Sequence, residues 1–381
     1  MFKDRYIKNN VLKDLGKKII LISGPRQCGK TTFSKALSSS FDYINYDSSE
    51  DRELILKKSW DRTKALIIFD ELHKLKNWKS YLKGIYDKEG LRPAILVTGS
   101  ARLDLMRKAD DSLAGRFFRY RLHPFDLKEL CEIDPNSDLN KTLDQLLELG
   151  GFPEPFLEGS PEFYHRWRKS HTDSVIKQDL VELNSVRDIL AVETLIELLR
   201  SRVGSPISYA SLAEDLQYSP KTIKSWLEIL ENLYVIFKVT PYHRNIARSL
   251  LKEPKYYFYD TGLVNGDEGV KLENLTACSL LKECQFLEDS LGVDYTLNYL
   301  RNKQGQEVDF LVGINNQFSL IEVKNADENL SKNLNFFHKF FPNSKAIQIT
   351  KKCQREQTFP NGEEIRDTAK WLAKLPLLGK V

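Results

Sequence analysis

The chain contains the stretch Gly24-Pro25-Arg26-Gln27-Cys28-Gly29-Lys30-Thr31, which matches the phosphate-binding loop pattern G-x-x-x-x-G-K-[ST] at every fixed position. The apolar run 18–23 before it has the length of a buried strand, and residues 32–37 after it read as a helix. This order brings successive backbone N–H groups and a helix N-terminus to bear on one anion. A glycine-rich turn without a ligand is the alternative, and it leaves the full match of pattern and context unexplained.

The same stretch predicts how a nucleotide is held. Lys30 is expected to reach the β- and γ-phosphates, and the Thr31 hydroxyl is expected to ligate Mg²⁺. The predicted ATP-binding residues are therefore the eight of the loop together with Thr32. Cys28 lies inside the loop, where oxidation of its thiol would block the nucleotide, although a role as a small filler explains it as well.

A second apolar run, residues 65–71, ends in the two acids Asp70 and Glu71. In open α/β sheets, ligands lie at the carboxyl ends of the strands, so both acids are predicted to point toward the phosphate loop. Asp70 would then hold Mg²⁺ with the nucleotide, and Glu71 would polarise the attacking water. The alternative is a strand that stops at a solvated acidic turn.

A third apolar run, residues 94–100, ends near Thr98 and Ser100. We predict that Ser100, or alternatively Thr98, senses the γ-phosphate or positions water. Arg116 is the predicted arginine finger, because phosphoryl transfer builds negative charge that a fixed guanidinium offsets. A structural salt bridge is an equal alternative for Arg116. If it acts on a neighbour's nucleotide the protein is a homo-oligomer, whereas action on its own nucleotide needs only a monomer.

Length and composition set wider bounds. The 381 residues predict two or three domains, and 41% hydrophobic with 29% charged residues is typical of a globular protein. The net charge of +4 permits nucleic-acid contact without arguing for it. The five cysteines form no C-x-x-C pair, which suits free thiols in a reducing cytoplasm. No signal peptide and no membrane-spanning run is expected.

The middle of the chain predicts a change from sheet to helices. Residues 126–190 read as a helical lid or linker, in which Gly150-Gly151 is predicted to be a hinge. Residues 191–245 show three helices followed by a strand, the outline of a winged helix-turn-helix. The second helix of this helix-turn-helix begins with Lys221, Thr222 and Lys224, which favours contact with nucleic acid. A winged helix used only for packing explains the pattern equally well.

The last part, residues 246–381, carries a second acidic pattern. Asp309 lies in one predicted strand of a hairpin, and Glu322 and Lys324 share one face of the other. Two carboxylates and a lysine in a D…E-x-K arrangement predict a Mg²⁺ or Mn²⁺ site of nuclease type, with Lys324 positioning water and Glu273 completing the site. The alternative is a cross-strand salt bridge.

Several segments together resemble the prokaryotic AAA-type P-loop ATPases that are fused to a C-terminal domain of unknown function. They are the phosphate loop, IFDE at 68–71, GSAR at 99–102, LAGR at 113–116 with Pro124-Phe125, YFYDTGL at 257–263, LENL at 272–275, EVDF at 307–310 and IEVK at 321–324. The resemblance covers nearly the whole chain. It implies an ATPase core in residues 1–125, a winged-helix segment and a C-terminal α/β domain similar to restriction endonucleases. Thr276, Cys278 and Ser279 make the helix after Glu273 unusually polar, which departs from the family pattern.

Two functions follow as predictions. The first is an ATPase that hydrolyses ATP with Mg²⁺ and couples turnover to a DNA-binding or RNA-binding, nuclease-like C-terminal region. The second is a nucleotide-controlled binding switch, a regulator or defence component whose C-terminal domain docks a partner without cutting nucleic acid.

Overall fold

The computed structural model divides the chain into two compact units. Unit 1 comprises residues 1–123 with 232–234 and 289–291, and unit 2 comprises the remainder. The described residues are 4–99, 113–174, 180, 188–243, 253–326 and 329–377. Among these, no helix combines the length and the apolar character that crossing a membrane requires.

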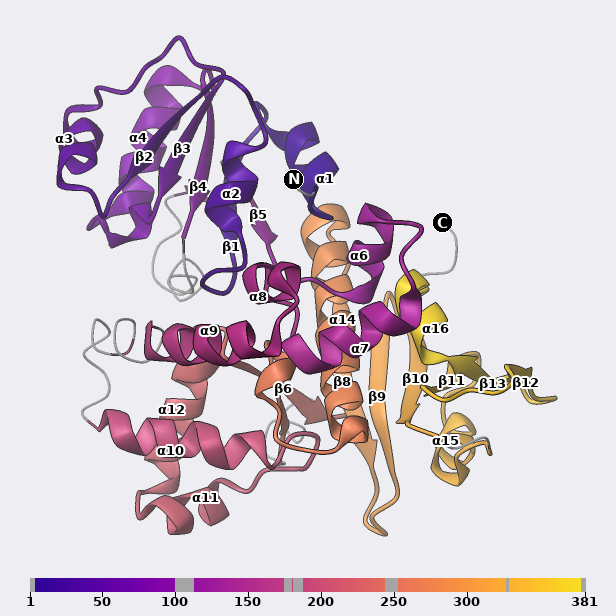
Figure 1. Ribbon diagram of the computed structural model, residues 1–381. Helices are drawn as coiled ribbons and strands as arrows, with labels where there is room; N and C mark the ends of the chain where they lie inside the picture. Colours follow the sequence, from indigo (N-terminus) through magenta and orange to yellow (C-terminus); the bar gives the residue numbers. More distant parts are fainter. Residues whose placement is uncertain are drawn as a thin grey trace. The chain divides into compact units, whose positions relative to one another are not determined.

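Unit 1 is built on a parallel sheet of five strands in the order β2-β3-β4-β1-β5 (Figure 1). The strand order places β1, which leads into the phosphate loop, next to β4 and one strand away from β3. The predicted α/β parallel sheet is therefore confirmed. The strands are β1 (Ile19–Ser23), β2 (Phe41–Asn45), β3 (Leu66–Asp70), β4 (Ala94–Thr98) and β5 (Phe117–Arg121).

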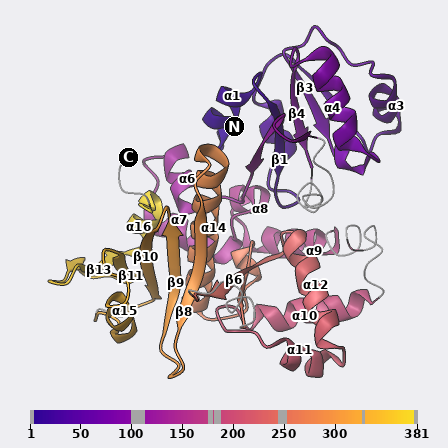
Figure 2. The same ribbon diagram turned by 180° about the vertical axis from the view of Figure 1, so that it is seen from behind.

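Helices cover both faces of this sheet, which explains why its central strands read as unbroken apolar runs. Alternate residues of β1, β3 and β4 pack against α3 (Ser49–Lys57) and α4 (Trp78–Glu89) in one core. Helix α2 (Lys30–Lys35) lies on the opposite face from α4, as Figures 1 and 2 show. The short helices α1 (Lys8–Asp14) and η1 (Leu72–Lys74) complete the described helices of the unit.

Unit 2 contains an eight-stranded mixed sheet in the order β12-β13-β11-β10-β9-β8-β6-β7. Strands β8, β9 and β10 form an antiparallel meander, while β10, β11 and β13 run parallel. The β9–β10 turn is Asn315-Asn316, both with positive φ, as a tight hairpin requires. The strands are β6 (Ile236–Pro241), β7 (Lys255–Phe258), β8 (Tyr295–Arg301), β9 (Glu307–Ile314), β10 (Gln317–Lys324), β11 (Lys345–Thr350), β12 (Gln357–Thr358) and β13 (Glu363–Asp367).

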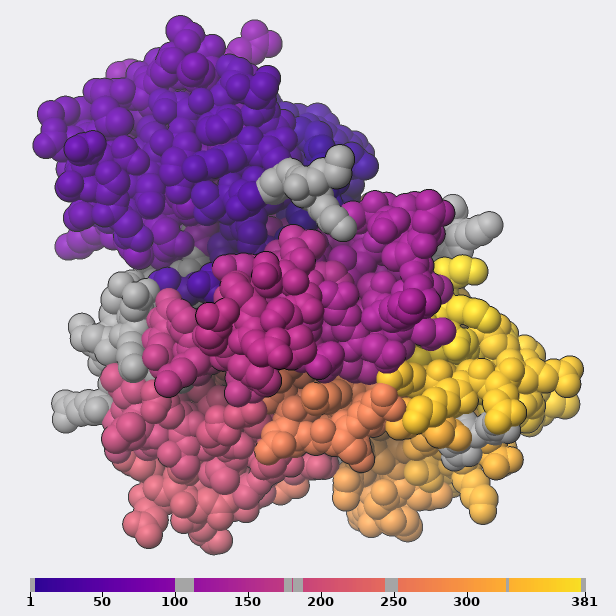
Figure 3. Space-filling model, viewed as in Figure 1, coloured from indigo at the N-terminus to yellow at the C-terminus, as the bar shows by residue number. Residues whose placement is uncertain are grey.

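The long helix α14 (Glu268–Leu291) runs beside this sheet, and shorter helices lie over it. In Figure 1 helices α7 and α8 lie in front of α14, and in Figure 2 they lie behind it. Figure 3 shows the same helices from outside, where magenta atoms hide most of the orange α14. The other helices are α6 (Leu127–Ile133), α7 (Leu139–Leu149), α8 (Pro153–Glu158), α9 (Pro161–Ser174), α10 (Ile189–Arg200), α11 (Tyr209–Leu216), α12 (Pro220–Asn232), η5 (Thr261–Leu263), α15 (Lys332–His338) and α16 (Thr368–Lys374).

The domain boundaries within unit 2 differ from the predicted ones. The predicted order of three helices and then strands does occur, as α10, α11, α12, β6 and β7. However, β6 pairs with β7 on one side and with β8 on the other. A boundary at 245/246 would therefore cut through a strand pair inside one continuous sheet. Residues 124–381, apart from the two short segments assigned to unit 1, form one compact unit.

The Gly150-Gly151 turn is tightly packed inside unit 2, which corrects its prediction as a hinge. A Cβ on Gly151 would lie 2.2 Å from the Phe125 carbonyl oxygen, and a Cβ on Gly150 would lie 1.9 Å from Oδ1 of Asp260. The Phe125 N–H also donates to the Gly151 carbonyl at 2.6 Å. The glycines are needed here because two chain segments meet without room for a side chain.

We expect Gly151→Ala to destabilise unit 2, because the new methyl group meets a backbone atom that cannot rotate away. Overpacking of this kind costs about 1–3 kcal/mol. Calorimetric unfolding of the full chain measures the loss. Gly269→Ala is the control in unit 2, because its Cβ would meet a side-chain atom and no backbone atom, Oδ1 of Asp267 at 3.2 Å. Equal melting temperatures for the two variants would contradict the expectation.

Candidate functional site

The phosphate loop connects β1 to α2 and depends on backbone conformations that favour glycine. Gly29, with φ of 92°, caps the start of α2, and Gly24 has φ of 150°. A Cβ on Gly24 would lie 2.2 Å from the Leu122 carbonyl oxygen, so a larger residue would push the loop away from the sheet. Cys28 is buried within the loop, and its Sγ lies 3.2 Å from the same carbonyl.

Lys30, the first residue of α2, directs its side chain back into the loop. The side chain is buried, and its Nζ donates to the carbonyl oxygens of Gly24 at 2.9 Å and Pro25 at 2.6 Å. Backbone carbonyls therefore fix the ammonium at the loop's concave side. Thr32, the other predicted binding residue of this helix, is exposed in the first turn.

Asp70, at the end of β3, is the centre of a cluster of hydroxyl groups. Its Oδ2 accepts hydrogen bonds from Thr31 Oγ1 and from the Tyr43 hydroxyl, each at 2.8 Å. Its Oδ1 accepts from Thr98 Oγ1 at 2.5 Å. Parallel register explains the gathering, because Asp70 pairs with Thr98 of β4 on one side and with Asn45 of β2 on the other. Three donors hold the buried carboxylate in one orientation.

Glu71 follows directly and lies in the left-handed region, with φ of 55°. Its N–H donates to the Thr98 carbonyl at 3.0 Å, which fixes this backbone turn. Burial raises the pKa of its carboxyl above the ordinary value of 4.5, and the nearby charge of Lys30 opposes the rise. Its Oε2 lies 3.5 Å from His73 Nε2 and 3.9 Å from Lys74 Nζ. A non-glycine residue in this conformation is typical of functional sites.

These residues fit a nucleotide with Mg²⁺. The Thr31 hydroxyl and the Asp70 carboxylate are hard oxygen donors, which Mg²⁺ prefers, and they lie at hydrogen-bonding distance beside the loop. The ammonium of Lys30 supplies positive charge at the same place. Arg26, within the loop, is near enough to lower the pKa of Glu71 through its charge.

Two other residues of unit 1, Ser100 and Arg116, were predicted to act on the nucleotide. Ser100 lies outside the described residues. Arg116 immediately precedes β5, whose first residue pairs with the first residue of β1, so Arg116 lies at the amino-terminal edge of the sheet. The phosphate loop follows the opposite edge. Arg116 instead forms an ion pair with Asp87 of α4 at 2.9 Å. Sheet geometry therefore keeps Arg116 away from the nucleotide of its own chain, which corrects its role as a finger acting in cis.

In unit 2, the predicted acidic residues gather around a residue that the sequence analysis missed. Lys255, the first residue of β7, has only 1% of its side chain exposed. Its Nζ lies 2.6 Å from Glu307, 3.2 Å from Glu273 and 4.0 Å from Asp309. Burial lowers the pKa of Lys255, but the three carboxylates outweigh burial and raise the pKa above its ordinary value. Its ammonium is the cation of this acidic cluster.

Two carboxylates of this cluster, Glu273 and Asp309, have raised pKa values because they are buried close to one another. Burial, followed by the charge of Asp309, raises the pKa of Glu273 to about 7. Glu273 also accepts a hydrogen bond from the Tyr257 hydroxyl at 2.7 Å. Gly204 packs against it so closely that a Cβ would lie 2.8 Å from the Glu273 carboxylate. The segment between α10 and α11 therefore covers the cluster.

Glu322 and Lys324 lie on the neighbouring strand and pair with each other. Lys324 Nζ lies 2.8 Å from Glu322 Oε1, as the two-residue spacing predicted. Burial and then the Asp309 charge raise the pKa of Glu322 to about 7. Asp309 itself accepts from the Val323 N–H at 2.8 Å. Asp309 is thus bound to the backbone of β10, and its negative charge raises the pKa of both Glu273 and Glu322.

The predicted C-terminal metal site stays a prediction, and its acids are paired with lysines in this structure. Within the described part of the chain, no three His, Cys, Asp or Glu side chains are grouped so that they could hold a metal ion. Lys255 neutralises Glu273 and Asp309, while Lys324 neutralises Glu322. Two ammonium groups thus divide the acids into separate ion pairs. In the sequence, Lys255 is a lysine at the start of an aromatic strand. This pattern points to a role only once the burial of the lysine is known.

The predicted nucleic-acid residues lie on the surface of unit 2. Ser219 caps α12 through a hydrogen bond from the Thr222 N–H at 3.1 Å, and Lys221 and Lys224 are exposed in its first turns. The apolar face of the helix, with Ile223 and Leu227, is buried. The two arginines beyond, Arg244 and Arg248, lie outside the described residues.

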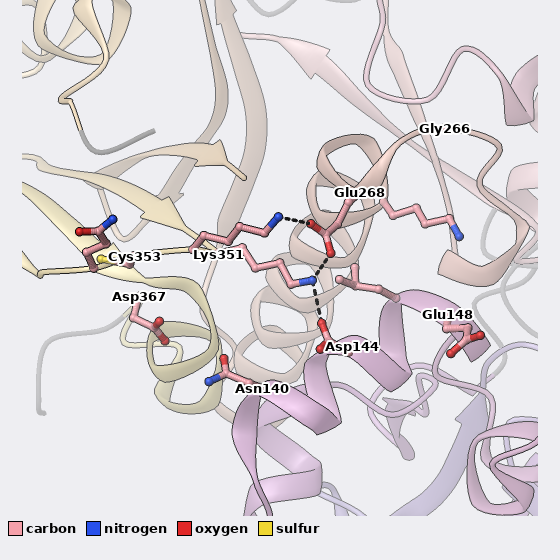
Figure 4. A pocket seen from close by; sticks show the side chains of 12 residues that line it. Asn140, Asp144, Glu148, Gly266, Glu268, Lys351, Cys353 and Asp367 are labelled. Atoms are coloured by element: carbon pink, nitrogen blue, oxygen red, sulfur yellow. Dashed lines mark hydrogen bonds and ion pairs between the residues drawn. The ribbon is translucent and has the colours of Figure 1, made fainter. Parts of the chain in front are cut away.

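Unit 2 also has a hollow of about 780 Å³ between α7, the start of α14 and the residues after β11 (Figure 4). Lys351 crosses it, with Nζ 2.7 Å from Asp144 and in an ion pair with Glu268. None of the predicted site residues lines this hollow. A hollow of about 960 Å³ in unit 1, lined by Lys17, Arg92 and residues near them, lies at the sheet edge opposite the phosphate loop.

Three family models match parts of the chain. Residues 16–131 match an AAA domain, residues 140–273 match a domain of unknown function (DUF8612), and residues 268–367 match another (DUF4143). An uncharacterized protein of Mycobacterium tuberculosis is 28% identical over 318 residues, covering 80% of this chain and 70% of that protein. An uncharacterized protein of Haemophilus influenzae is 25% identical over 391 residues, covering 93% and 94%.

Solved structures add only distant likenesses. A Thermotoga maritima RuvB variant is 17% identical with a TM-score of 0.28, and covers 65% of this chain and 94% of that chain. The PCH-2 protein of C. elegans is 16% identical with a TM-score of 0.26, covering 59% and 70%. The domain assignment therefore rests on the matched residues and on the parallel sheet with its phosphate loop. The chain carries an AAA domain of the P-loop NTPase type, followed by a C-terminal DUF4143 domain.

Proposed function

We propose that the protein is a Mg²⁺-dependent ATPase. The observation that carries the proposal is the Asp70 carboxylate, held by three hydroxyl groups directly beside a complete phosphate loop. Lys30 would exchange its two carbonyl contacts for phosphate oxygens, and Thr31 and Asp70 would hold Mg²⁺. The metal offsets negative charge on the transferring phosphoryl group when bound.

Glu71 is the proposed general base for the attacking water. Its carboxylate lies next to Asp70 in the chain, and the pKa of Glu71 responds to the charges of Lys30 and Arg26. Those charges lower the pKa of the carboxyl and so oppose the effect of burial. The backbone bond to Thr98 holds the turn that aims it.

The pH dependence of hydrolysis tests this role. Because the ionised carboxylate is the active form and burial raises its pKa above 4.5 in the nucleotide-free protein, kcat/KM, which reports the free enzyme, is expected to rise with pH through an acid limb above the usual glutamate range. We expect Glu71→Gln to lose that limb and about a hundredfold of kcat, with nucleotide affinity retained. Glu53→Gln on exposed α3 is the control. A Glu71→Gln profile that keeps the wild-type limb would contradict the assignment.

For unit 2 we propose that ATP turnover is coupled to binding of nucleic acid, DNA or RNA, through α10, α11 and α12. The supporting observation is the exposed start of α12, with Lys221 and Lys224 in its first turns and the opposite face buried. The start of the second helix is the place at which helix-turn-helix segments contact bases and phosphates.

A second function, a nucleotide-controlled switch that docks a partner without cutting it, is favoured by one observation. Lys255 and Lys324 already neutralise the acids that a nuclease would offer to a metal ion. No cleavage step is therefore derived from these residues. In this function unit 2 recognises its partner, and the acidic cluster serves to join β7, β9 and α14.

Purified full-length protein distinguishes the proposals. ATP hydrolysis is measured with Mg²⁺ and with EDTA, and labelled single-stranded and double-stranded DNA and RNA are tested for binding and cleavage with and without ATP. Mg²⁺-dependent hydrolysis supports the ATPase, and its absence contradicts it. Nucleotide-dependent binding of nucleic acid supports the coupling. Cleavage with Mg²⁺ or Mn²⁺ that Asp309→Ala abolishes would overturn the switch.

A further inference from the structure

Tyr43 lies in the nucleotide site although no motif includes it. It belongs to β2, two residues before Asn45, whose Cα is paired with that of Asp70. Because side chains two apart share one face of a strand, the ring of Tyr43 points to the same face as Asn45. Its hydroxyl donates to Oδ2 of Asp70 at 2.8 Å, the oxygen that also accepts from Thr31.

The ring of Tyr43 is itself held in place. Lys35, in the last turn of α2, has its Nζ 3.6 Å from the ring centroid, a cation–π contact. An ordinary phenol is protonated in the neutral pH range, so the Tyr43 hydroxyl is the donor of the bond to the Asp70 carboxylate.

The three hydroxyl groups around Asp70 bond to different oxygens of its carboxylate. Thr98, fully buried, holds Oδ1, while Tyr43 and Thr31 share Oδ2. Thr31 has a second task as the residue proposed to meet Mg²⁺. Without Tyr43, Oδ2 would keep only the bond from Thr31, and Thr98 alone would hold the carboxylate independently of the residue proposed to meet Mg²⁺.

We propose that Tyr43 is a positioning residue for the Mg²⁺–nucleotide complex, because it fixes Asp70 independently of Thr31. This inference rests on the proposed ATPase function and names a residue that neither the loop pattern nor the acidic strand end contains. Outer partners of metal-binding groups typically contribute about tenfold or more to metal affinity. Tyr43 is expected to act on the metal and to leave the nucleotide's own contacts unchanged.

The test uses Tyr43→Phe, which keeps the ring and its contact with Lys35 and removes only the hydroxyl. Binding of an ATP analogue with an N-methylanthraniloyl fluorophore is measured in EDTA and then during a Mg²⁺ titration. We expect unchanged affinity in EDTA, and about a tenfold higher Mg²⁺ concentration for half-maximal enhancement of binding. Tyr46→Phe, three residues on, is the control and should match the wild type, because Tyr46 meets Asp70 through its backbone N–H, which the substitution keeps.

Three readouts separate the possible failures. A Tyr43→Phe protein with the wild-type Mg²⁺ response overturns the inference and leaves the ATPase proposal standing. A wild-type protein whose nucleotide binding ignores Mg²⁺ overturns both. Loss of affinity in EDTA together with a lower melting temperature of the nucleotide-free protein shows a purely structural role, and likewise overturns the inference.

Discussion

Replacing Lys30 by alanine is expected to lower the ATPase rate and the affinity for nucleotide by at least about a hundredfold. Lys30 supplies the buried positive charge at the loop, and its Nζ already lies against two loop carbonyls at 2.9 and 2.6 Å. Alanine leaves the phosphates with backbone N–H donors alone. Fluorescent-nucleotide binding and steady-state hydrolysis by the full chain measure both losses.

Lys57→Ala is the matched control for this prediction. Lys57 lies on exposed α3, where it forms a surface pair with Glu53 at 2.8 Å. Surface pairs of this kind contribute little to stability, so this variant should retain wild-type binding. Full ATPase activity in Lys30→Ala would show that the loop does not hold the hydrolysed nucleotide, and the assignment of the site would be wrong.

Replacing Lys255 by methionine is expected to destabilise unit 2 by about 3–5 kcal/mol, the usual cost of removing one partner from a buried ion pair. Methionine preserves much of the volume, so the loss reports the charge. Three carboxylates, from Glu273, Glu307 and Asp309, would remain without the ammonium between them. Calorimetry of the full chain should show a large shift in the transition of unit 2.

The pH dependence gives this prediction its sign. Without Lys255, the acids relieve their repulsion by taking up protons, and burial has already raised the pKa of Glu273 to about 7. Lys255 lowers that pKa in the wild type, so in the variant it lies higher still, and the deficit should be widest at alkaline pH and shrink as pH falls toward about 7. Lys352→Ala, on the surface of unit 2 with its Nζ 3.8 Å from Glu268, should cost little. A Lys255→Met protein as stable as wild type would refute the role of the ammonium.

Much of unit 1 was predictable from sequence because its signals are local. The loop from Gly24 to Thr31 and the acids after β3 are contiguous in the chain, and parallel strands bring their carboxyl ends to one edge. Arg116 needed more than local signals. The sequence places it just before β5, but only the parallel pairing of β5 with β1 shows that this end lies at the edge opposite the phosphate loop.

Unit 2 was less predictable because its contacts join distant segments. The hairpin of Asp309 with Glu322 and Lys324 was read from spacing, since both strands are neighbours in sequence. One ammonium beside these acids comes from Lys255 of β7, more than fifty residues before Asp309 within the same predicted domain, at a distance where spacing gives no signal. In the sequence, Gly150-Gly151 likewise indicates a hinge. Only the structure shows that the Phe125 carbonyl oxygen packs against Gly151.

The sequence by itself determined the phosphate loop, the acidic end of β3 and the parallel sheet around them, because backbone conformation and strand burial follow from residues adjacent in the chain. Tertiary structure alone decided that Tyr43 reaches Asp70 and that Lys255 neutralises the acidic cluster. A tyrosine and a lysine acquire such roles only through burial beside a carboxylate, and burial depends on which strands pair. Consecutive residues thus form the phosphate loop, whereas strand pairing determines which side chains contact the buried acids.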